Sequence, residues 1–414
     1  MLIAAVAGLA MRLAFGLGYW VGKPLTHDER EYLALAESVS AGRGFVYEAG
    51  HETGTAQQFG RAPAYPLFLA LIGASDGHAD AAPARVKIAQ AFVGALGVWL
   101  IGLLGRRAAG PAAGVAAAAI ASVYPPLVWI CAYVLSEALY STLALLTVLL
   151  LNMAMDRADV GDKRSGSFAG AAGLAAGVSI LVRPAMLLFL PTAAVWLIAR
   201  RRPRLAIGLI AAAMLVVLPW TARNLQVYDR FVLVASEGGV TFWTGNHPLA
   251  RGEGDLAANP DIKVAELAFR SQHPGLTAEE LEPLYYRDAL AYIAAHPVWW
   301  LGLLMKKAFY TIVPAGPSYT LHSTLYRVSS VASYLILLPF AALGLGAWQR
   351  RPHRPEALFL LAASAVIVGL VFFPQERFRI PVIDPTLIVC AGIWYGLRTL
   401  APIRRASEHS RVNP

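Results

Sequence analysis

Long apolar stretches alternate with short polar ones along most of the chain, and this pattern predicts membrane-spanning helices. A span needs about 20 mostly apolar residues, and ten segments approach that length with few charges inside. Their ranges are 2–20, 88–105, 112–130, 134–154, 168–182, 184–199, 205–220, 328–348, 357–373 and 382–400. The predicted fold class is therefore an all-α polytopic membrane protein with a bundle of about ten transmembrane helices.

The composition excludes an ordinary water-soluble enzyme. Hydrophobic residues fill 57% of the 414 positions and charged residues only 15%, whereas a soluble domain carries about 25% charged residues. Lysine and arginine number 35 against 26 acidic residues, which gives a net charge of +9. The two cysteines, Cys131 and Cys390, lie in apolar stretches and indicate no disulfide framework.

The positions of the positive charges predict the topology. Segment 297–313 has nearly the length of a span, but Lys306 and Lys307 near its middle would cost several kcal/mol at the bilayer centre. If this segment is instead an interfacial helix, five short segments on one side hold nearly half of all 35 lysines and arginines, as the positive-inside rule requires. The five segments are 106–107, 155–167, 200–204, 349–356 and the residues after Leu397. Both termini, including the tail 401–414, are thus predicted to be cytoplasmic, and the charge requires no nucleic-acid partner.

The opposite, outer side then holds two long segments, 21–84 and 221–327. Loops of that length are usually functional, so we expect residues 1–414 to form a single membrane domain whose working face lies outside. The short apolar segment 61–73 is too short to span the membrane, and we predict that it forms an interfacial helix. No internal repeat or inverted symmetry is evident, which disfavours a rocking transporter.

Two acidic positions are candidates for chemistry. Asp28 and Glu29 follow the first span and open a segment with helical apolar spacing, which predicts an amphipathic surface helix. Asp28 is interpreted either as the N-cap of that helix or as a general base held at the membrane surface. Glu137 lies about one turn into segment 134–154, where an unpaired carboxylate is expensive and indicates function. A helix-start glutamate within reach of water is the alternative.

Seven segments together resemble one family of membrane enzymes. The acidic pair is followed by an amphipathic helix that ends in Gly42, Gly44 and Phe45. The other six segments are 61–72 (RAPAYPLFLALI), 134–140 (VLSEALY), 181–191 (LVRPAMLLFLP), 218–224 (LPWTARN), 242–248 (FWTGNHP) and 376–385 (ERFRIPVIDP). In this order they resemble the GT-C superfamily of membrane glycosyltransferases, above all glycosyltransferase families 39 and 83, the protein O-mannosyltransferase-like and aminoarabinose transferase-like proteins.

The resemblance implies an inverting glycosyltransferase in a bacterial-type plasma (inner) membrane. It would move a monosaccharide from a polyprenyl-phosphate donor to a lipid, glycan or protein acceptor on the outer face. Such a reaction needs a carboxylate for the acceptor proton and cations for the leaving phosphate. The candidate catalytic residues are Asp28, Glu29 and Glu137. The candidates for binding the donor phosphate or the substrate are Arg61, Tyr65, Arg183, Asn246, Lys306, Lys307, Arg377 and Arg379.

Several alternatives stay open at this point. The interfacial cations could simply reach the lipid head groups, and Asn246 could serve only a turn. The spacing of His27, His247 and Cys131 indicates no metal site, so no cofactor is expected, although a divalent ion on Asp28 and Glu29 stays an alternative. A transporter or flippase, or a polymerase or ligase of lipid-linked saccharides, would share the lipid-phosphate substrate. Ionisable residues gathered at the outer edge, rather than at mid-bilayer, favour the enzyme.

Overall fold

The structure, a computed structural model, describes residues 1–46, 60–254, 258–314, 316, 323–348 and 356–412, with side chains up to residue 399. Over these ranges the chain is helical and has no strand, which confirms the predicted all-α class. The helices are α1 (Leu2–Leu13), α2 (His27–Ser40), α3 (Ala64–Leu71), α4 (Ala84–Ala109), α5 (Pro111–Val123), α6 (Pro125–Trp129), α7 (Glu137–Asp159), α8 (Ser165–Val182), α9 (Phe189–Ala199), α10 (Pro203–Tyr228), α11 (Gly238–Asn246), α12 (Pro260–Ser271), α13 (Ala278–Ala295), α14 (Pro297–Ile312), α15 (Thr324–Trp348), α16 (Glu356–Val371), α17 (Glu376–Arg379) and α18 (Ile383–Val412). The π-helical turn η1 (Ala14–Tyr19) continues α1, and the short 3₁₀ turns η2 (Ile130–Ala132) and η3 (Pro184–Leu188) follow α6 and α8.

Helix length and composition confirm a multi-pass membrane protein. Among the described residues, six helical stretches are long and apolar enough to span a membrane: Leu2–Tyr19, α4, α7, α8, α10 and α15. The pair Pro111–Val123 and Pro125–Ala132 passes the same test together but is bent by 64°. Two shorter apolar helical segments, Pro184–Ala199 and Glu356–Val371, coincide with two further predicted spans. The total of ten spans stays a prediction.

Small residues let neighbouring helices of the bundle approach closely. Gly173 and Gly177, one turn apart on α8, face α10, and a Cβ at either position would collide with the carbonyl groups of Leu209 and Ala213. In membranes, such small-residue stripes replace the hydrophobic driving force with close van der Waals packing. The packing of α8 against α10 therefore depends on the absence of side chains at Gly173 and Gly177.

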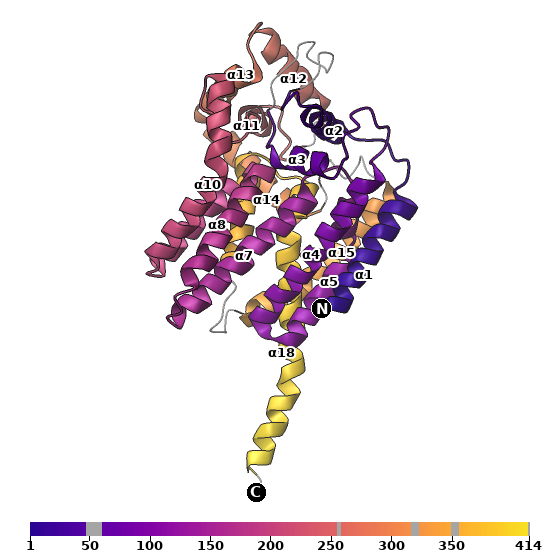
Figure 1. The fold of residues 1–414 in the computed structure, drawn as a ribbon, viewed down its shortest axis with the longest axis vertical. Helices are drawn as coiled ribbons and strands as arrows, with labels where there is room; N and C mark the ends of the chain where they lie inside the picture. Colours follow the sequence, from indigo (N-terminus) through magenta and orange to yellow (C-terminus); the bar gives the residue numbers. More distant parts are fainter. Residues whose placement is uncertain (47–59, 255–257, 315, 317–322, 349–355, 413–414) are drawn as a thin grey trace.

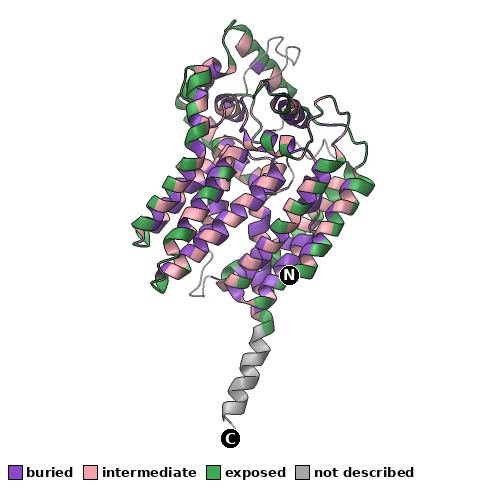
Figure 2. Cartoon of the chain, in the orientation of Figure 1, coloured by how far each residue is buried: buried purple, intermediate pink, exposed green. Residues whose placement is uncertain are grey.

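The bundle carries a cap of helices at one end (Figure 1). Helices α2, α3, α11, α12 and α13 lie above the bundle, and both chain termini lie toward its opposite end. Figure 2 shows that buried residues line the inward faces of the bundle helices, whereas exposed residues line the outward faces. The two long segments predicted to share the outer side, 21–84 and 221–327, supply the cap helices. Lipid would cover the apolar outward faces.

The orientation of the cap can be tested with single cysteines, because the native Cys131 and Cys390 are both buried. After both are replaced by alanine, we expect Ser271→Cys, exposed on the cap at the end of α12, to react with a membrane-impermeant thiol reagent in intact cells. Lys163→Cys, exposed between α7 and α8, should react only after permeabilisation. Labelling of Lys163→Cys in intact cells would show that the connection between α7 and α8 lies outside, which would contradict the predicted topology.

Candidate active site

The first turn of α2 is capped by Thr26 and Glu29, not by Asp28. The Glu29 carboxylate accepts hydrogen bonds from the Thr26 backbone N–H at 2.8 Å and from its hydroxyl at 2.9 Å. Together they form a capping box at the start of the helix. The other Glu29 oxygen accepts from the Val134 N–H at 2.8 Å. Glu29 is buried, with 2% of its surface exposed. Its hydrogen bonds join α2 to the chain segment that precedes α7.

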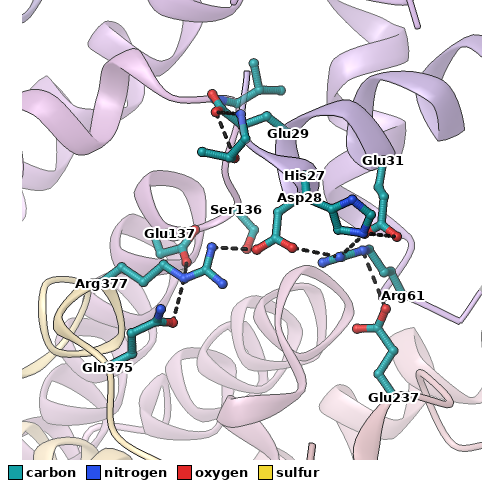
Figure 3. A network of polar contacts seen from close by, with 12 residues as sticks. His27, Asp28, Glu29, Glu31, Arg61, Ser136, Glu137, Glu237, Gln375 and Arg377 are labelled. Atoms are coloured by element: carbon teal, nitrogen blue, oxygen red, sulfur yellow. Dashed lines mark hydrogen bonds and ion pairs between the residues drawn. The ribbon is translucent and has the colours of Figure 1, made fainter. Parts of the chain in front are cut away.

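Asp28, the second residue of α2, points toward two arginines (Figure 3). One carboxylate oxygen accepts from Arg61 Nη2 at 3.0 Å, and the other lies 2.6 Å from Arg377 Nη1. Arg61 precedes α3, and Arg377 lies on α17, more than 300 positions further along the chain. Folding therefore brings two other segments of the chain to one carboxylate on α2.

The charges continue on both sides of Asp28 as alternating acids and arginines. On one side, Arg377 Nε lies 3.9 Å from Glu137 Oε1, and the same oxygen accepts from Arg183 Nη1 at 2.8 Å. On the other side, Arg61 contacts Glu31 and lies 3.5 Å from Glu237 Oε1. We call these seven side chains the Asp28 cluster: Asp28, Glu31, Arg61, Glu137, Arg183, Glu237 and Arg377. It holds four carboxylates and three guanidinium groups.

The surroundings of Asp28 determine its proton affinity. Burial by itself would raise the pKa of this carboxyl, but the positive charges of Arg377 and Arg61 outweigh burial and hold the pKa well below its usual range. Asp28 is therefore fully ionised near neutral pH and, with both arginines in place, is a weak base.

Two aromatic rings support the Arg61 side of the cluster. The Arg61 guanidinium lies 4.9 Å from the centre of the Tyr32 ring, which makes an edge contact with Tyr65 at 4.8 Å. Tyr65 is fully buried, and its hydroxyl donates to Gln90 Oε1 at 3.1 Å. The structure therefore places Tyr65 behind Tyr32, one layer away from the charged groups. An arginine stacked on an aromatic ring loses little freedom when it binds an anion.

Lys307 and Asn246 form a separate group. Lys307 is fully buried, and its ammonium donates to Asn246 Oδ1 and to the Leu370 carbonyl, both at 3.0 Å. Trp300 Nε1 also donates to Asn246 Oδ1. The Asn246 amide group donates to the carbonyls of Phe242 and Val371, so this side chain is occupied on both ends. Lys307 thus caps the last carbonyls of α16, whereas its neighbour Lys306 is exposed.

We expect Lys307→Met to destabilise the fold, because it leaves the Leu370 carbonyl without its donor. The expected loss in the free energy of unfolding is about 1–3 kcal/mol, seen as a lower melting temperature of the purified protein. The matched control is Lys306→Met, one residue away and exposed, which should change the melting temperature little. Equal effects of the two variants would contradict the capping role.

Arg379 also lies outside the Asp28 cluster. It is 4% exposed and pairs with the buried Asp384 at 2.8 Å, while its guanidinium lies 3.8 Å from the centre of the Tyr334 ring. The Tyr124 hydroxyl donates to the other Asp384 oxygen at 3.2 Å. This buried pair joins α17 and α18 to the hinge between α5 and α6. Arg377 and Arg379 are thus only two positions apart but have different partners. Arg377 contacts Asp28, whereas Arg379 pairs with Asp384 inside the helix packing.

Sequence reasoning missed two members of the cluster. Glu31 carried a usable signal, because it lies three residues after Asp28 and so shares a helix face with it. Glu237, just before α11, carried none, since only the folding of the cap brings it to Arg61. No group of three or more metal-ligating side chains occurs in the part of the chain that the structure describes. The Asp28 and Glu29 carboxylates face different partners, so this pair does not fit a shared divalent ion.

The comparisons with known proteins agree with this architecture. The family model for dolichyl-phosphate-mannose-protein mannosyltransferase matches residues 61–225, which include Arg61, Glu137 and Arg183. No curated protein matches the chain. The findings confirm the predicted resemblance to the GT-C superfamily of membrane glycosyltransferases.

Two solved structures of an archaeal enzyme share the fold at low sequence identity. The oligosaccharyltransferase AglB from Archaeoglobus fulgidus, in complex with an inhibitory peptide and a dolichol-phosphate, matches with a TM-score of 0.57 and 15% identity, over 99% of this chain and 51% of that one. The A. fulgidus oligosaccharyltransferase tethered to an acceptor peptide matches with a TM-score of 0.60 and 14% identity, over 95% and 49%. ArnT from Cupriavidus metallidurans bound to undecaprenyl phosphate gives 0.42 and 16%, over 95% and 76%. The chain thus spans about half the length of the archaeal enzymes that it matches.

Proposed function

We propose that the protein is an inverting glycosyltransferase that moves a monosaccharide from a polyprenyl-phosphate donor to an acceptor on the outer face of a bacterial-type inner membrane. The observation that carries the proposal is the Asp28 carboxylate between Arg61 and Arg377. This arrangement provides a general base beside two anion-binding groups, the set that glycosyl–phosphate cleavage requires. The match to the mannosyltransferase family model supports it independently.

In the proposed reaction, an acceptor hydroxyl attacks the anomeric carbon from the face opposite the phosphate. The new carbon–oxygen bond forms while the bond between that carbon and the phosphate oxygen breaks. The hydroxyl proton passes to Asp28, and the lipid phosphate leaves with the bonding electron pair, stabilised by Arg377 and Arg61. For an acceptor that is already an anion, Asp28 would instead stabilise the positive charge that develops on the sugar.

The pairing of Asp28 with both arginines gives the donor a second role. A phosphate that takes over contacts of Arg377 and Arg61 removes part of the positive field around Asp28 and adds a negative charge nearby. Both changes raise the pKa of Asp28 from its low value toward that of an effective base. Donor binding would therefore precede and activate proton removal, while Glu137 and Glu237 keep the two arginines oriented.

The remaining candidates keep different places in this proposal. Arg183 acts through Glu137, to which it donates, and does not reach Asp28. Lys306 is exposed on α14 and is available to a lipid phosphate at the membrane surface. Glu29, Tyr65, Asn246, Lys307 and Arg379 would support the site through the packing described above, without contacting the substrate.

The test is transfer by the purified protein, supplied with a panel of radiolabelled polyprenyl-phosphate sugars and crude membrane acceptors. We expect one class of sugar to move into acceptor, with release of the polyprenyl phosphate, in the wild type but not in Asp28→Asn. Movement of intact lipid-linked sugar across a vesicle membrane, without cleavage, would favour a flippase. Transfer of long glycan chains only would favour a polymerase or ligase.

A further inference from the structure

Arg12, like Lys307 and Arg379, is a buried cation that lies outside the Asp28 cluster. Arg12 lies within the first apolar span and is 3% exposed. Its Nη1 donates to the Gly8 carbonyl at 3.0 Å and its Nη2 to the Ala121 carbonyl at 3.4 Å. Among the described side chains no carboxylate lies within ion-pair distance of Arg12. A charged side chain at this depth is costly, and such residues are usually functional.

The helices around Arg12 leave space for its guanidinium group. A Cβ at Gly94, on α4, would lie 2.6 Å from Arg12 Nε and 2.7 Å from Cys131 Sγ, and a Cβ at Gly8 would lie 3.0 Å from Arg12 Nη1. Alanine at either position would push against the charged group. Because Gly8 and Gly94 have no side chains, the Arg12 side chain fits between α1 and α4.

A small cavity is lined both by Arg12 and by Glu137 of the Asp28 cluster. It has a volume of about 20 Å³, and Arg12 and Glu137 both line it, together with Ser141 and Thr142. A cavity of this size holds about one water molecule, provided that two to four polar groups surround it. Arg12 Nε, a donor, and Glu137 Oε2, an acceptor, are both buried and have no hydrogen-bonded partner assigned among the described residues. The Cys131 thiol lies beside the guanidinium and lines the same cavity.

We propose that a water molecule in this cavity bridges Arg12 Nε to Glu137 Oε2, and that Arg12 is thereby a positioning residue for Arg377. The water accepts from the guanidinium and donates to the carboxylate. The other oxygen of Glu137 accepts from Arg183 and faces Arg377 Nε at 3.9 Å. A water that holds the Glu137 carboxylate in place would therefore also hold Arg377, which lies beside both Glu137 and Asp28 (Figure 3). The functional part of this inference rests on the proposed role of Arg377.

A purely structural role for Arg12 makes a different prediction. Through its bonds to Gly8 and Ala121, Arg12 also joins α1 to α5. If that were its whole role, substitution would lower stability but leave the hydration of Glu137 unchanged. The two interpretations therefore differ in a spectroscopic signature and not in thermal stability.

The deciding experiment is infrared difference spectroscopy of the purified protein in ordinary water and in water labelled with oxygen-18. We expect one isotope-sensitive water band of the wild type to be lost or shifted in both Arg12→Met and Glu137→Gln. Gly94→Ala should shift the same band while Arg12 is retained, which covers the case that Arg12→Met folds poorly. The control is Gly18→Ala, where a Cβ meets nothing within 4 Å, and its spectrum should match the wild type.

A functional measurement completes the test. Binding of polyprenyl phosphate should weaken about tenfold in Arg12→Met and in Gly94→Ala, as expected for partial loss of one charge-assisted contact, and should be unchanged in Gly18→Ala. The absence of any water band shared by Arg12 and Glu137 would overturn the inference. A shared water band in a protein that transfers no sugar would uphold the bridge and contradict the proposed function instead.

Discussion

Asp28→Asn is expected to lower sugar transfer by roughly 100- to 10,000-fold, the usual cost of removing a general base. Asparagine keeps the size of the side chain and a carbonyl oxygen for Arg61 or Arg377. It removes the negative charge and the proton-accepting oxygen. Because Thr26, and not Asp28, caps α2, the substitution should leave the helix and the membrane level of the protein intact. Turnover is measured with the labelled donor identified in the transfer assay.

The matched control is Asp261→Asn. Asp261 occupies the equivalent second position of α12 and pairs with Arg251 at 3.3 Å, but on the exposed surface of the cap. An effect of charge or helix start alone would appear in both variants, so transfer by Asp261→Asn should stay near the wild-type rate. Near-normal turnover by Asp28→Asn at equal membrane levels would reject Asp28 as the base and leave Glu137 as the acidic candidate.

Arg377→Ala is expected to weaken binding of the polyprenyl-phosphate donor by roughly one to two decades. Loss of a charge-assisted hydrogen bond to phosphate costs about 1.5–3 kcal/mol, and about 1.4 kcal/mol corresponds to tenfold in affinity. The substitution also removes a partner of Asp28 and Glu137, so proper insertion must be verified from extraction and size-exclusion behaviour. Donor affinity is measured directly with labelled lipid, without turnover.

Arg230→Ala serves as the control for this variant, since Arg230 pairs with Glu280 at 3.2 Å on the exposed part of the cap. Its donor affinity should equal that of the wild type. If Arg377→Ala retained full donor affinity as well, the phosphate site would have to lie elsewhere, with the exposed Lys306 as the next candidate.

The sequence by itself determined the class of the protein. Span length and the bias of lysine and arginine are local properties, so they predict a multi-pass helical bundle without any knowledge of packing. The order of short motifs carried the resemblance to GT-C enzymes, which the family match confirms. The sequence also indicated Asp28, Arg61, Glu137, Arg183 and Arg377 as candidate site residues. In the structure these five side chains lie in one cluster.

Only the tertiary structure separated neighbours that look alike in sequence. Asp28 faces two arginines while Glu29 caps a helix, although the Thr-x-x-Glu spacing of the capping box was already visible in the sequence. Lys306 is exposed while Lys307 is buried against α16.

The physical reason is the geometry of the helix and its packing. Successive residues of a helix point about 100° apart, so adjacent side chains face different neighbours. Which neighbour each one meets depends on segments far away in the chain. Arg377 reaches Asp28 and Glu237 reaches Arg61 only because the cap and the bundle pack against each other, and no local pattern encodes contacts across such sequence distances.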